Sequence, residues 1–165
     1  MNAHPHHRQD VTGIACAALT ISDTRTPETD TSGQRVRELL AAAGHHIAHY
    51  QILPDDPERI VSVLQALPAA AEVVILNGGT GLARRDTTYE AVTRLLEKEI
   101  TGFGELFRML SYEQVGAAAM LSRATAGVCG RRILFSLPGS TTAVDLAMTK
   151  LIVPQLGHLV GLVRG

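Results

Sequence analysis

The chain of 165 residues is poor in several residue types on which whole classes of protein depend. It contains no tryptophan, and aromatic residues make up only 4% of it, so stacking surfaces for single-stranded nucleic acid are not expected. Lysine and arginine (15 residues) nearly balance aspartate and glutamate (16 residues). This balance argues against a dedicated binder of nucleic acid or of anionic membranes, although it leaves room for a local basic pocket.

Cysteine and long apolar runs are also scarce. The two cysteines, Cys16 and Cys129, lie far apart and match no zinc spacing, and both are surrounded by small apolar residues. Buried reduced thiols are therefore expected, with no sign of an oxidising compartment. The N-terminal residues lack the apolar core of a signal peptide, and no run offers about 18 uncharged apolar residues. We expect a cytoplasmic protein without a membrane segment.

The composition that remains is typical of a compact globular domain, with 45% hydrophobic and 19% charged residues. A chain of this length fits one domain and buries roughly 68–70% of its unfolded surface without disulfide or metal cross-links. Residues 1–11 are mostly polar and predict a mobile N-terminal tail. Residues 12–165 predict a single α/β domain.

Apolar runs alternate with helical patterns along this domain. Runs that suit strands occupy residues 12–21, 46–53, 72–77 and 132–137. Helical periodicity covers residues 32–43, 57–67, 88–99, 105–110 and 113–121, and a last stretch that begins at Ser140 and contains Pro154. Asp56 before a proline predicts one helix start, the TTYE run at 87–90 predicts another as a capping box, and Pro154 predicts a kink or break. This alternation predicts a mostly parallel sheet with helices on both faces.

Polar or glycine-rich residues follow all four predicted strands. In open parallel sheets, ligands bind outside the carboxyl ends of the strands, so these residues are site candidates wherever the strand order brings them together. They are Ser22 and Asp23 after the first strand, Asp55 and Asp56 after the second, Gly78, Gly79, Thr80 and Gly81 after the third, and Pro138, Gly139 and Ser140 after the fourth. The sequence does not show the order of the strands in the sheet.

The GGTG run at residues 78–81 is the strongest of these signals. Glycines let the backbone turn sharply and point bare N–H groups at a ligand oxygen, which suits a phosphate. A plain tight turn explains the run alone equally well. The run is not a P-loop, because no Gly-Lys-Ser/Thr follows, and it lacks the third glycine of the dinucleotide fingerprint.

Two arginines and an aspartate, Arg84, Arg85 and Asp86, close the same loop. Guanidinium groups beside a glycine loop suit a polyphosphate or a carboxylate, and Asp86 with Asp55 suits a Mg²⁺ that bridges phosphate oxygens. A helix cap at Asp86 and an ordinary turn at Asp55 are the alternatives, and the residues by themselves favour the turn. Glu105, in a glycine-containing segment, either lines a pocket or is a charge on a helix face.

Taken together, these motifs resemble the signature of the MoaB/MogA family of molybdenum cofactor biosynthesis. The family's GGTG and RD-T-x-EA elements match residues 78–81 and 85–91, and its GFGE element matches residues 102–105. Its shorter SD, PD, LSR and PGS elements follow in the same order along nearly the whole chain. The runs at 109–113 and 121–124 are more similar to the MoaB branch than to the MogA branch.

The resemblance implies a molybdopterin-binding fold, a three-layer α/β/α sandwich, assembled as a homotrimer or a homohexamer. It also implies Mg²⁺- and ATP-dependent transfer of AMP to the terminal phosphate of molybdopterin, with release of pyrophosphate. Asp55 and Asp86 would then be the key acids and would hold Mg²⁺, while the glycine loop and Arg85 would bind phosphates. The SD and PGS loops, and Glu105 of the GFGE element, would contact the pterin or the nucleotide. Other enzymes of the same pathway are candidate partners.

Two positions depart from the family pattern. Asn77 stands where the family usually has threonine before GGTG, and Thr141 stands where proline often follows PGS. These departures leave open a non-catalytic protein that binds molybdopterin or assists assembly, although the two retained acids favour the enzyme. A generic nucleotide-binding regulator, without pterin affinity, is a third hypothesis. The motifs do not distinguish a molybdenum pathway from a tungsten pathway.

The last helical stretch bears on assembly. Its apolar residues, which include Leu146, Leu156 and Leu162, extend around much of the helix circumference. Such a helix either buries a second face against another subunit or lies deep inside its own domain.

Overall fold

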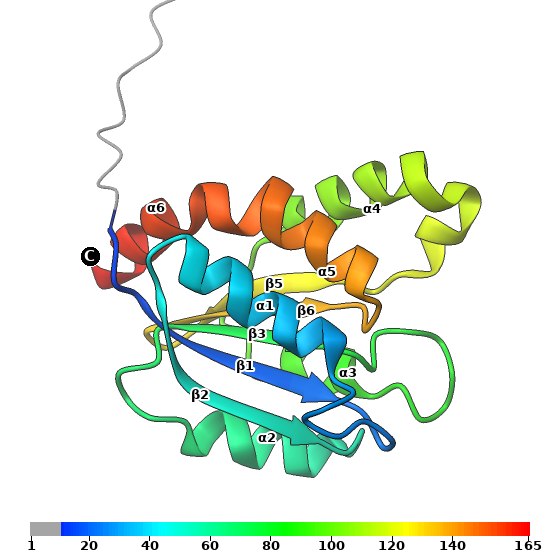
Figure 1. Ribbon diagram of the computed structural model, residues 1–165, viewed down its shortest axis with the longest axis horizontal. Coiled ribbons are helices and arrows are strands. Elements are labelled where there is room, and N and C mark those ends of the chain that lie inside the picture. Colours follow the sequence, from blue (N-terminus) through cyan, green and yellow to red (C-terminus); the bar gives the residue numbers. More distant parts are fainter. Residues whose placement is uncertain (1–10) are drawn as a thin grey trace, which may run out of the picture.

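The computed structural model describes residues 11–165 of the chain. A six-stranded sheet runs through the molecule with helices on both faces (Figure 1). The strands are β1 (Ala15–Ile21), β2 (His46–Leu53), β3 (Val73–Asn77), β4 (Lys98–Glu99), β5 (Thr125–Cys129) and β6 (Arg132–Leu137). The tail predicted at residues 1–11 lies outside the described residues, except for Val11, which packs against the hydrophobic core.

The strands are ordered β2-β1-β3-β6-β5-β4 across the sheet. The four strands that the sequence predicts are all present and pair in parallel, whereas β5 runs antiparallel to both β6 and β4. The sequence analysis missed β4 and β5. β4 has only two residues, and β5 (TAGVC) contains a glycine and little apolar bulk, so neither produces the apolar run of a central strand.

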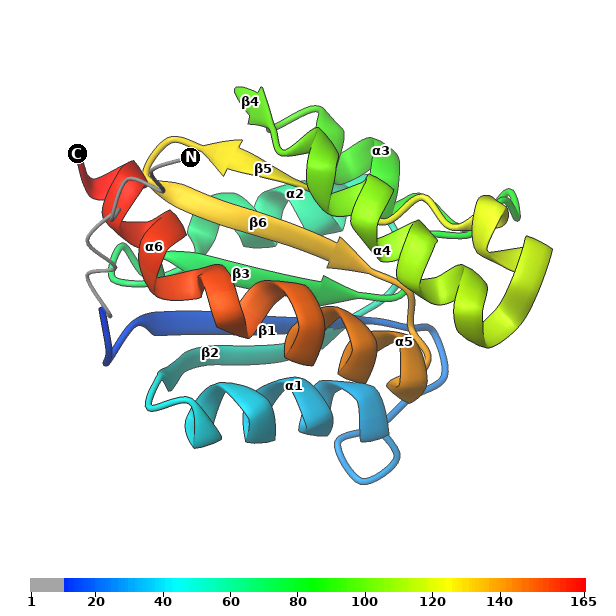
Figure 2. The same ribbon diagram turned by 90° about the horizontal axis from the view of Figure 1, so that it is seen from above.

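Two helical layers cover the sheet, which confirms the three-layer α/β/α sandwich (Figure 2). One layer contains α1 (Thr31–Ala42), α4 (Thr101–Val115) and a C-terminal helix, and it encloses the larger cluster of buried apolar residues. The C-terminal helix comprises α5 (Thr141–Ala147), the π-helical turn η2 (Met148–Ile152) and α6 (Val153–Arg164). The opposite layer consists of α2 (Pro57–Ala66) and α3 (Thr88–Thr93) over a smaller cluster.

Side-chain caps fix the helix starts that face the carboxyl ends of the strands. Asp56 caps α2, as predicted, and Ser140 caps α5; each accepts a hydrogen bond from the N–H three residues further on. Asp30 caps α1 in the same way, which the sequence analysis did not identify. The caps leave these helix N-termini at the same edge of the sheet as the loops that follow the strands.

The structure corrects the helices predicted between residues 88 and 121. α3 ends at Thr93 rather than at residue 99, because Lys98 and Glu99 pair with β5, and tertiary pairing overrides local helical preference. The predicted capping box is wrong, since the Thr87 side chain makes no bond to its own helix. α4 is one helix where two were predicted. It ends at Val115, before Gly116, whose φ of 60° suits glycine, and a 3₁₀ turn, η1 (Gly116–Leu121), follows.

Pro154 does not end the C-terminal helix, although a π-helical turn divides its α-helical hydrogen bonding just before the proline. The helix runs from Thr141 to Arg164, and η2 lies directly before the proline, where a π-helical turn accommodates the missing N–H. By length and composition this helix is capable of crossing a membrane, yet its apolar residues lie in the core of the domain. Leu146 and Leu156 are buried, Leu159 is partly buried and Leu162 is strongly exposed, so the position inside the domain explains part of the apolar circumference.

Candidate functional site

The strand order brings the predicted loops to one edge of the sheet. β1 lies between β2 and β3, and the chain reverses its direction of strand addition at this point, which is where open α/β sheets bind ligands. The loops after β1, β2 and β3 enclose a hollow of about 140 Å³ there. It is lined by Ile21, Ser22, Asp23, Thr24, Asp55, Gly79, Arg85 and Asp86. The convergence on which the sequence analysis depended is therefore present.

Asp55 is held on one side of its carboxylate. Its Oδ1 accepts hydrogen bonds from the N–H (3.0 Å) and the hydroxyl (2.7 Å) of Thr87, while its own N–H donates to Oδ1 of Asp23 (3.1 Å). Within residues 11–165, Oδ2 of Asp55 has no hydrogen-bond donor. This use of the Thr87 hydroxyl explains why the capping box does not form. The same two bonds orient the Asp55 carboxylate and leave its Oδ2 free, so Asp55 is more than an ordinary turn residue.

The two leading glycines of the GGTG run are required by close contacts. Gly78 and Gly79 have φ of 108° and 66°, which side-chain-bearing residues rarely adopt. A Cβ on Gly78 would lie 2.2 Å from the carbonyl oxygen of Ile21. A Cβ on Gly79 would lie 2.5 Å from Asp55 Oδ2 and 2.1 Å from Thr88 Oγ1. The glycines therefore let the third loop pack against the first and leave Asp55 Oδ2 uncovered.

The hydroxyl of Thr88 is buried beside this point. Within the described part of the chain, Thr88 Oγ1 has no hydrogen-bond partner. Buried hydroxyls without a partner are uncommon, because leaving one unpaired costs roughly 1–3 kcal/mol. The hydroxyl thus marks unused hydrogen-bonding capacity directly behind the glycine loop.

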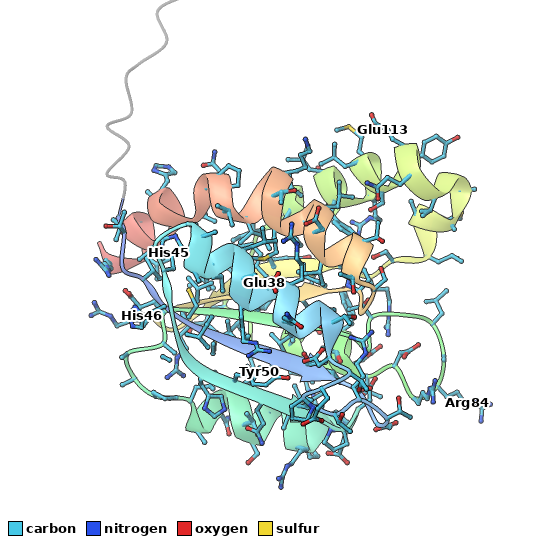
Figure 3. The ribbon with its side chains drawn as sticks, in the orientation of Figure 1. Glu38, His45, His46, Tyr50, Arg84 and Glu113 are labelled. Carbon is cyan, nitrogen blue, oxygen red and sulfur yellow. The ribbon has the colours of Figure 1, made fainter. Side chains whose placement is uncertain are left out.

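Asp86 and the two arginines occupy different positions in their loop. Asp86 Oδ2 accepts a hydrogen bond from the N–H of Ala83 (3.1 Å), so this residue closes its own loop and is not the helix cap considered as an alternative. Arg85 lines the hollow. Arg84 extends away from the molecule into solvent (Figure 3). Of the two guanidinium groups, that of Arg85 is placed to meet an anion in the hollow.

The donor set fits Mg²⁺ shared with a phosphate. Asp23, Asp55 and Asp86 each have one carboxylate oxygen in a hydrogen bond, and within residues 11–165 the other oxygen of each has none. No group of three or more acidic, histidine or cysteine side chains converges tightly enough in this range to enclose a metal. Mg²⁺ usually keeps several waters and binds through one or two carboxylates plus substrate phosphates, so no closed cage is needed. Asp55 and Asp86 are the residues that would hold it.

A buried polar network lies beneath the first loop. Asp30 accepts hydrogen bonds from the hydroxyls of Thr20 and Tyr50, each at 2.7 Å, besides capping α1. Burial alone raises the pKa of Asp30, but these bonds and the nearby Arg25 outweigh it, so the pKa lies below its usual value. Burial and the bond to Asp30 raise the pKa of Tyr50 to about 12. Asp30 therefore stays ionised and fixes the start of α1.

Asn77 belongs to this network and does not point into the glycine loop. Its Oδ1 accepts a hydrogen bond from the hydroxyl of Ser32 (2.7 Å), and its Nδ2 donates to Thr20 Oγ1 (3.1 Å). The side chain is fully buried. The departure from the family's usual threonine therefore changes a structural contact beneath the site rather than a surface available to a ligand.

Arg25 connects the loop after β1 with the loop after β6. Its guanidinium donates to Ser32 and Asp30 and, at 3.0 Å, to the carbonyl of Gly139. Gly139 in turn packs against the glycine loop, since a Cβ there would lie 3.3 Å from the Cα of Gly78. Arg25 was not predicted as a site residue; its position four residues after the end of β1 was the available signal.

Of the remaining predicted residues, some lie near the hollow and one does not. Pro138, Gly139 and Ser140 lie at the same edge of the sheet, although the Ser140 hydroxyl is engaged as a helix cap. Glu105 is exposed on α4, and within residues 11–165 no hydrogen bond or ion pair joins it to the loops of the hollow. The structure thus gathers the predicted acids, glycines and Arg85, and leaves Glu105 apart from them.

Comparison with known proteins agrees with these features. Residues 17–158 match the family model described as "Probable molybdopterin binding domain". A curated relative from Bacillus cereus, named molybdenum cofactor biosynthesis protein B, is 53% identical over 165 residues, which cover 96% of each chain. These matches extend over both the loops of the hollow and the elements that support them.

Solved structures show the same likeness in three dimensions. A crystal structure of a molybdenum cofactor biosynthesis protein B superposes with a TM-score of 0.90 at 53% identity, covering 93% of this chain and 97% of the other. The tungsten cofactor synthesizing protein MoaB from Pyrococcus furiosus gives a TM-score of 0.84 at 36% identity, covering 93% and 98%. The chain therefore belongs to the MoaB/MogA family of molybdopterin-binding domains, in its MoaB branch.

Proposed function

We propose that this protein acts in molybdenum cofactor biosynthesis as a molybdopterin adenylyltransferase, which transfers AMP from Mg²⁺-ATP to molybdopterin. Family membership supports the pathway, and the relative of higher identity has molybdenum rather than tungsten in its name. One observation carries the activity: oriented carboxylates from two different loops, Asp55 and Asp86, share a hollow with the glycine loop and Arg85. A site that only encloses a pterin has less need of two acids with free oxygens.

In the proposed reaction, an oxygen of the terminal phosphate of molybdopterin forms a bond to the α-phosphorus of ATP. The bond from that phosphorus to the oxygen bridging to the β-phosphate breaks, and pyrophosphate leaves with the bonding electrons. Negative charge spreads over phosphate oxygens throughout, so catalysis depends on alignment and charge stabilisation. Mg²⁺, when bound, supplies positive charge to these oxygens.

The chain's own groups provide the alignment. Thr87 fixes the Asp55 carboxylate with two hydrogen bonds, which directs the free Oδ2 past Gly79. The bare glycine backbone lets a phosphate approach closely, and Arg85 supplies a fixed positive charge at the same hollow. Ser22 and Asp23 on one side, and the PGS loop on the other, are proposed to hold the pterin and the nucleotide.

We further propose that the protein is a cytoplasmic homotrimer or homohexamer. The C-terminal helix gives part of its apolar surface to the core of its own domain, where Leu146, Leu156 and Val160 are buried. Large exposed apolar side chains gather instead on α4 and η1; they are Leu106, Met109, Tyr112, Val115, Met120 and Leu121. Light scattering after size-exclusion chromatography tests this proposal, and a stable monomer contradicts it.

The test of the activity is transfer of labelled AMP from ATP to freshly released molybdopterin, with and without Mg²⁺. Asp86→Asn should abolish Mg²⁺-dependent transfer, because it removes the charge of one proposed ligand and keeps the size of the side chain. Full transfer by Asp86→Asn contradicts the assignment of this acid. Molybdopterin binding without transfer by the unaltered protein would establish the alternative, a non-catalytic binding or assembly protein.

A further inference from the structure

Arg123 lies outside the hollow and contacts both ends of the loop that carries Asp86. It belongs to the short connection between η1 and β5. Its N–H (3.3 Å) and Nε (3.4 Å) donate to the carbonyl oxygen of Thr80, and its Nη2 donates to that of Asp86 at 2.9 Å. The backbone N–H and the guanidinium of Arg123 together therefore join the two points at which the loop leaves the fold and returns to it.

The charge of this guanidinium is already compensated. Arg123 forms an ion pair with Glu90 on α3 and lies 5.0 Å from the centre of the Tyr89 ring. The hydrogen bond from Arg123 holds the pKa of Glu90 below its usual value, so the pair is ionised at neutral pH. The side chain of Arg123 is only 23% exposed. A paired and largely covered guanidinium is suited to hold backbone groups in place rather than to capture an anion from solution.

Few other contacts restrain the loop between these two carbonyls. Ala83 and Asp86 bond to one another within the loop, and Leu82 projects into solvent with 67% exposure. Arg85 and Asp86, the two charged groups that this loop brings to the hollow, depend on its conformation. An arginine makes three such contacts at once because its planar fork carries five donors, which lysine does not match.

We infer that Arg123 is a positioning residue, which clasps the loop from Thr80 to Asp86 and thereby sets where Asp86 and Arg85 meet Mg²⁺ and phosphate. The inference rests on the proposed adenylyl transfer for its catalytic consequence, but the clasp itself is a property of the protein alone. Removal of the side chain frees the loop at Asp86 and leaves only the backbone bond at Thr80, while the sheet and the other acid, Asp55, stay in place.

The experiment compares Arg123→Gln and Arg123→Lys with the matched control Arg94→Gln. Arg94, the residue after α3, also pairs with a glutamate, Glu58, but that pair is exposed, and within residues 11–165 Arg94 has no hydrogen bond or ion pair to the loop. Hydrogen exchange of residues 80–87 is measured on the protein without substrate, and Mg²⁺ affinity is measured by calorimetric titration. Thermal unfolding of each variant shows whether the fold is retained.

In Arg123→Gln we expect loop exchange to rise about tenfold or more, because charge-assisted hydrogen bonds are lost. Mg²⁺ affinity should fall about tenfold, as for other losses of support behind a ligand, and AMP transfer about 100-fold. Arg123→Lys should give intermediate values, and Arg94→Gln should match the unaltered protein in loop exchange, Mg²⁺ affinity and AMP transfer. If Arg123→Gln does not fold, the hydrogen exchange of the loop and the Mg²⁺ affinity of Arg123→Lys test the inference.

Unchanged loop exchange and unchanged Mg²⁺ affinity in a folded Arg123 variant overturn the inference, whatever the transfer assay gives. Faster loop exchange with weaker Mg²⁺ binding supports it even if the unaltered protein transfers no AMP. In that case the proposed adenylyl transfer fails separately, and the clasp serves a binding site instead.

Discussion

At the amino end of the strands, a cavity of about 750 Å³ opens between α2, the β5–β6 hairpin and the end of α6. The hollow at the carboxyl end measures only about 140 Å³. Three arginines line the large cavity, Arg131, Arg132 and Arg164, and two of them already serve the fold. Arg132 donates hydrogen bonds to the carbonyls of Leu64, Leu67, Pro68 and Ala71, and Arg164 is paired with Glu72.

The two ends differ in that unpaired acceptors from three loops gather in the smaller hollow, and these acceptors, rather than volume, identify the candidate site. At the carboxyl end, Asp23, Asp55 and Asp86 each present an oxygen without a donor in residues 11–165, and Thr88 has an unpaired buried hydroxyl. Such groups gain free energy when a ligand satisfies them, whereas groups that are already paired must first give up a partner. Substitutions at the two ends should therefore have different effects.

The largest expected difference in AMP transfer is between Asp55→Asn and Glu72→Gln. Each substitution replaces a carboxylate by an amide of nearly the same size and removes one negative charge. Asp55→Asn should lower AMP transfer at least about 100-fold, because it removes a charge that stabilises the transition state. Glu72→Gln, at the large cavity, should leave transfer unchanged. A steady-state assay of both variants checks this, and a comparable loss in Glu72→Gln would contradict the assignment of function to one end.

A smaller effect is expected at Thr87, whose hydroxyl orients Asp55. Thr87→Val keeps the shape and removes the hydroxyl, and it should lower transfer about tenfold, in line with the loss of other supporting groups behind a ligand. Thr87→Ser keeps the hydroxyl and should retain most of the activity. The ratio of the two rates is the measurement; equal rates would show that the hydroxyl does not matter for Asp55.

At the amino end the effect should fall on stability. Arg132→Leu leaves the carbonyls at the end of α2 without their donor, and the free energy of unfolding should drop by about 2 kcal/mol. Transfer per folded molecule should stay the same. Urea unfolding, together with the transfer assay at a temperature where the variant is folded, checks both parts. Lost activity without lost stability would reverse the roles of the two ends.

The smallest effect concerns pH at the start of β2. Burial, and then the charge of His46, lowers the pKa of His45, whose Nδ1 accepts the N–H of Ile14 at 3.4 Å. The native state favours neutral His45, so its contribution is complete above the unfolded pKa of about 6.5 and is lost as the pH falls below that value. His45→Gln should flatten this part of the stability curve, measured by thermal unfolding between pH 7.5 and 5. An unchanged slope would assign the effect to other histidines.

Much of the candidate site was predictable because its residues sit at strand ends, which apolar runs reveal. Asp55, the glycines and Asp86 each follow such a run or lie in the loop behind it. Thr87 and Arg123 were not predictable as supports. Thr87 matched the pattern of a helix cap, and Arg123 lies 37 residues from Asp86 in the chain, so only folding shows which carbonyls it reaches.

The fold shows the same division. Asp56 acts through a bond to a residue three positions away, so the sequence predicts its cap correctly, and the Ser140 cap is equally local. β4 and β5 form through pairing between segments about 30 residues apart, and the helical periodicity of residues 94–99 gave way to that pairing. Local hydrogen bonds leave a local pattern, whereas pairing between distant segments does not.

The sequence by itself determined the α/β class, the parallel strands, the loops that carry chemistry and the family likeness, because each depends on residues close together in the chain. The tertiary structure alone decided that β1 lies between β2 and β3, and so that three of the loops share one hollow. It also decided which oxygens of Asp55 and Asp86 remain free. Those outcomes depend on contacts between loops about 30 residues apart, and sheet order and packing set these contacts, not local preference.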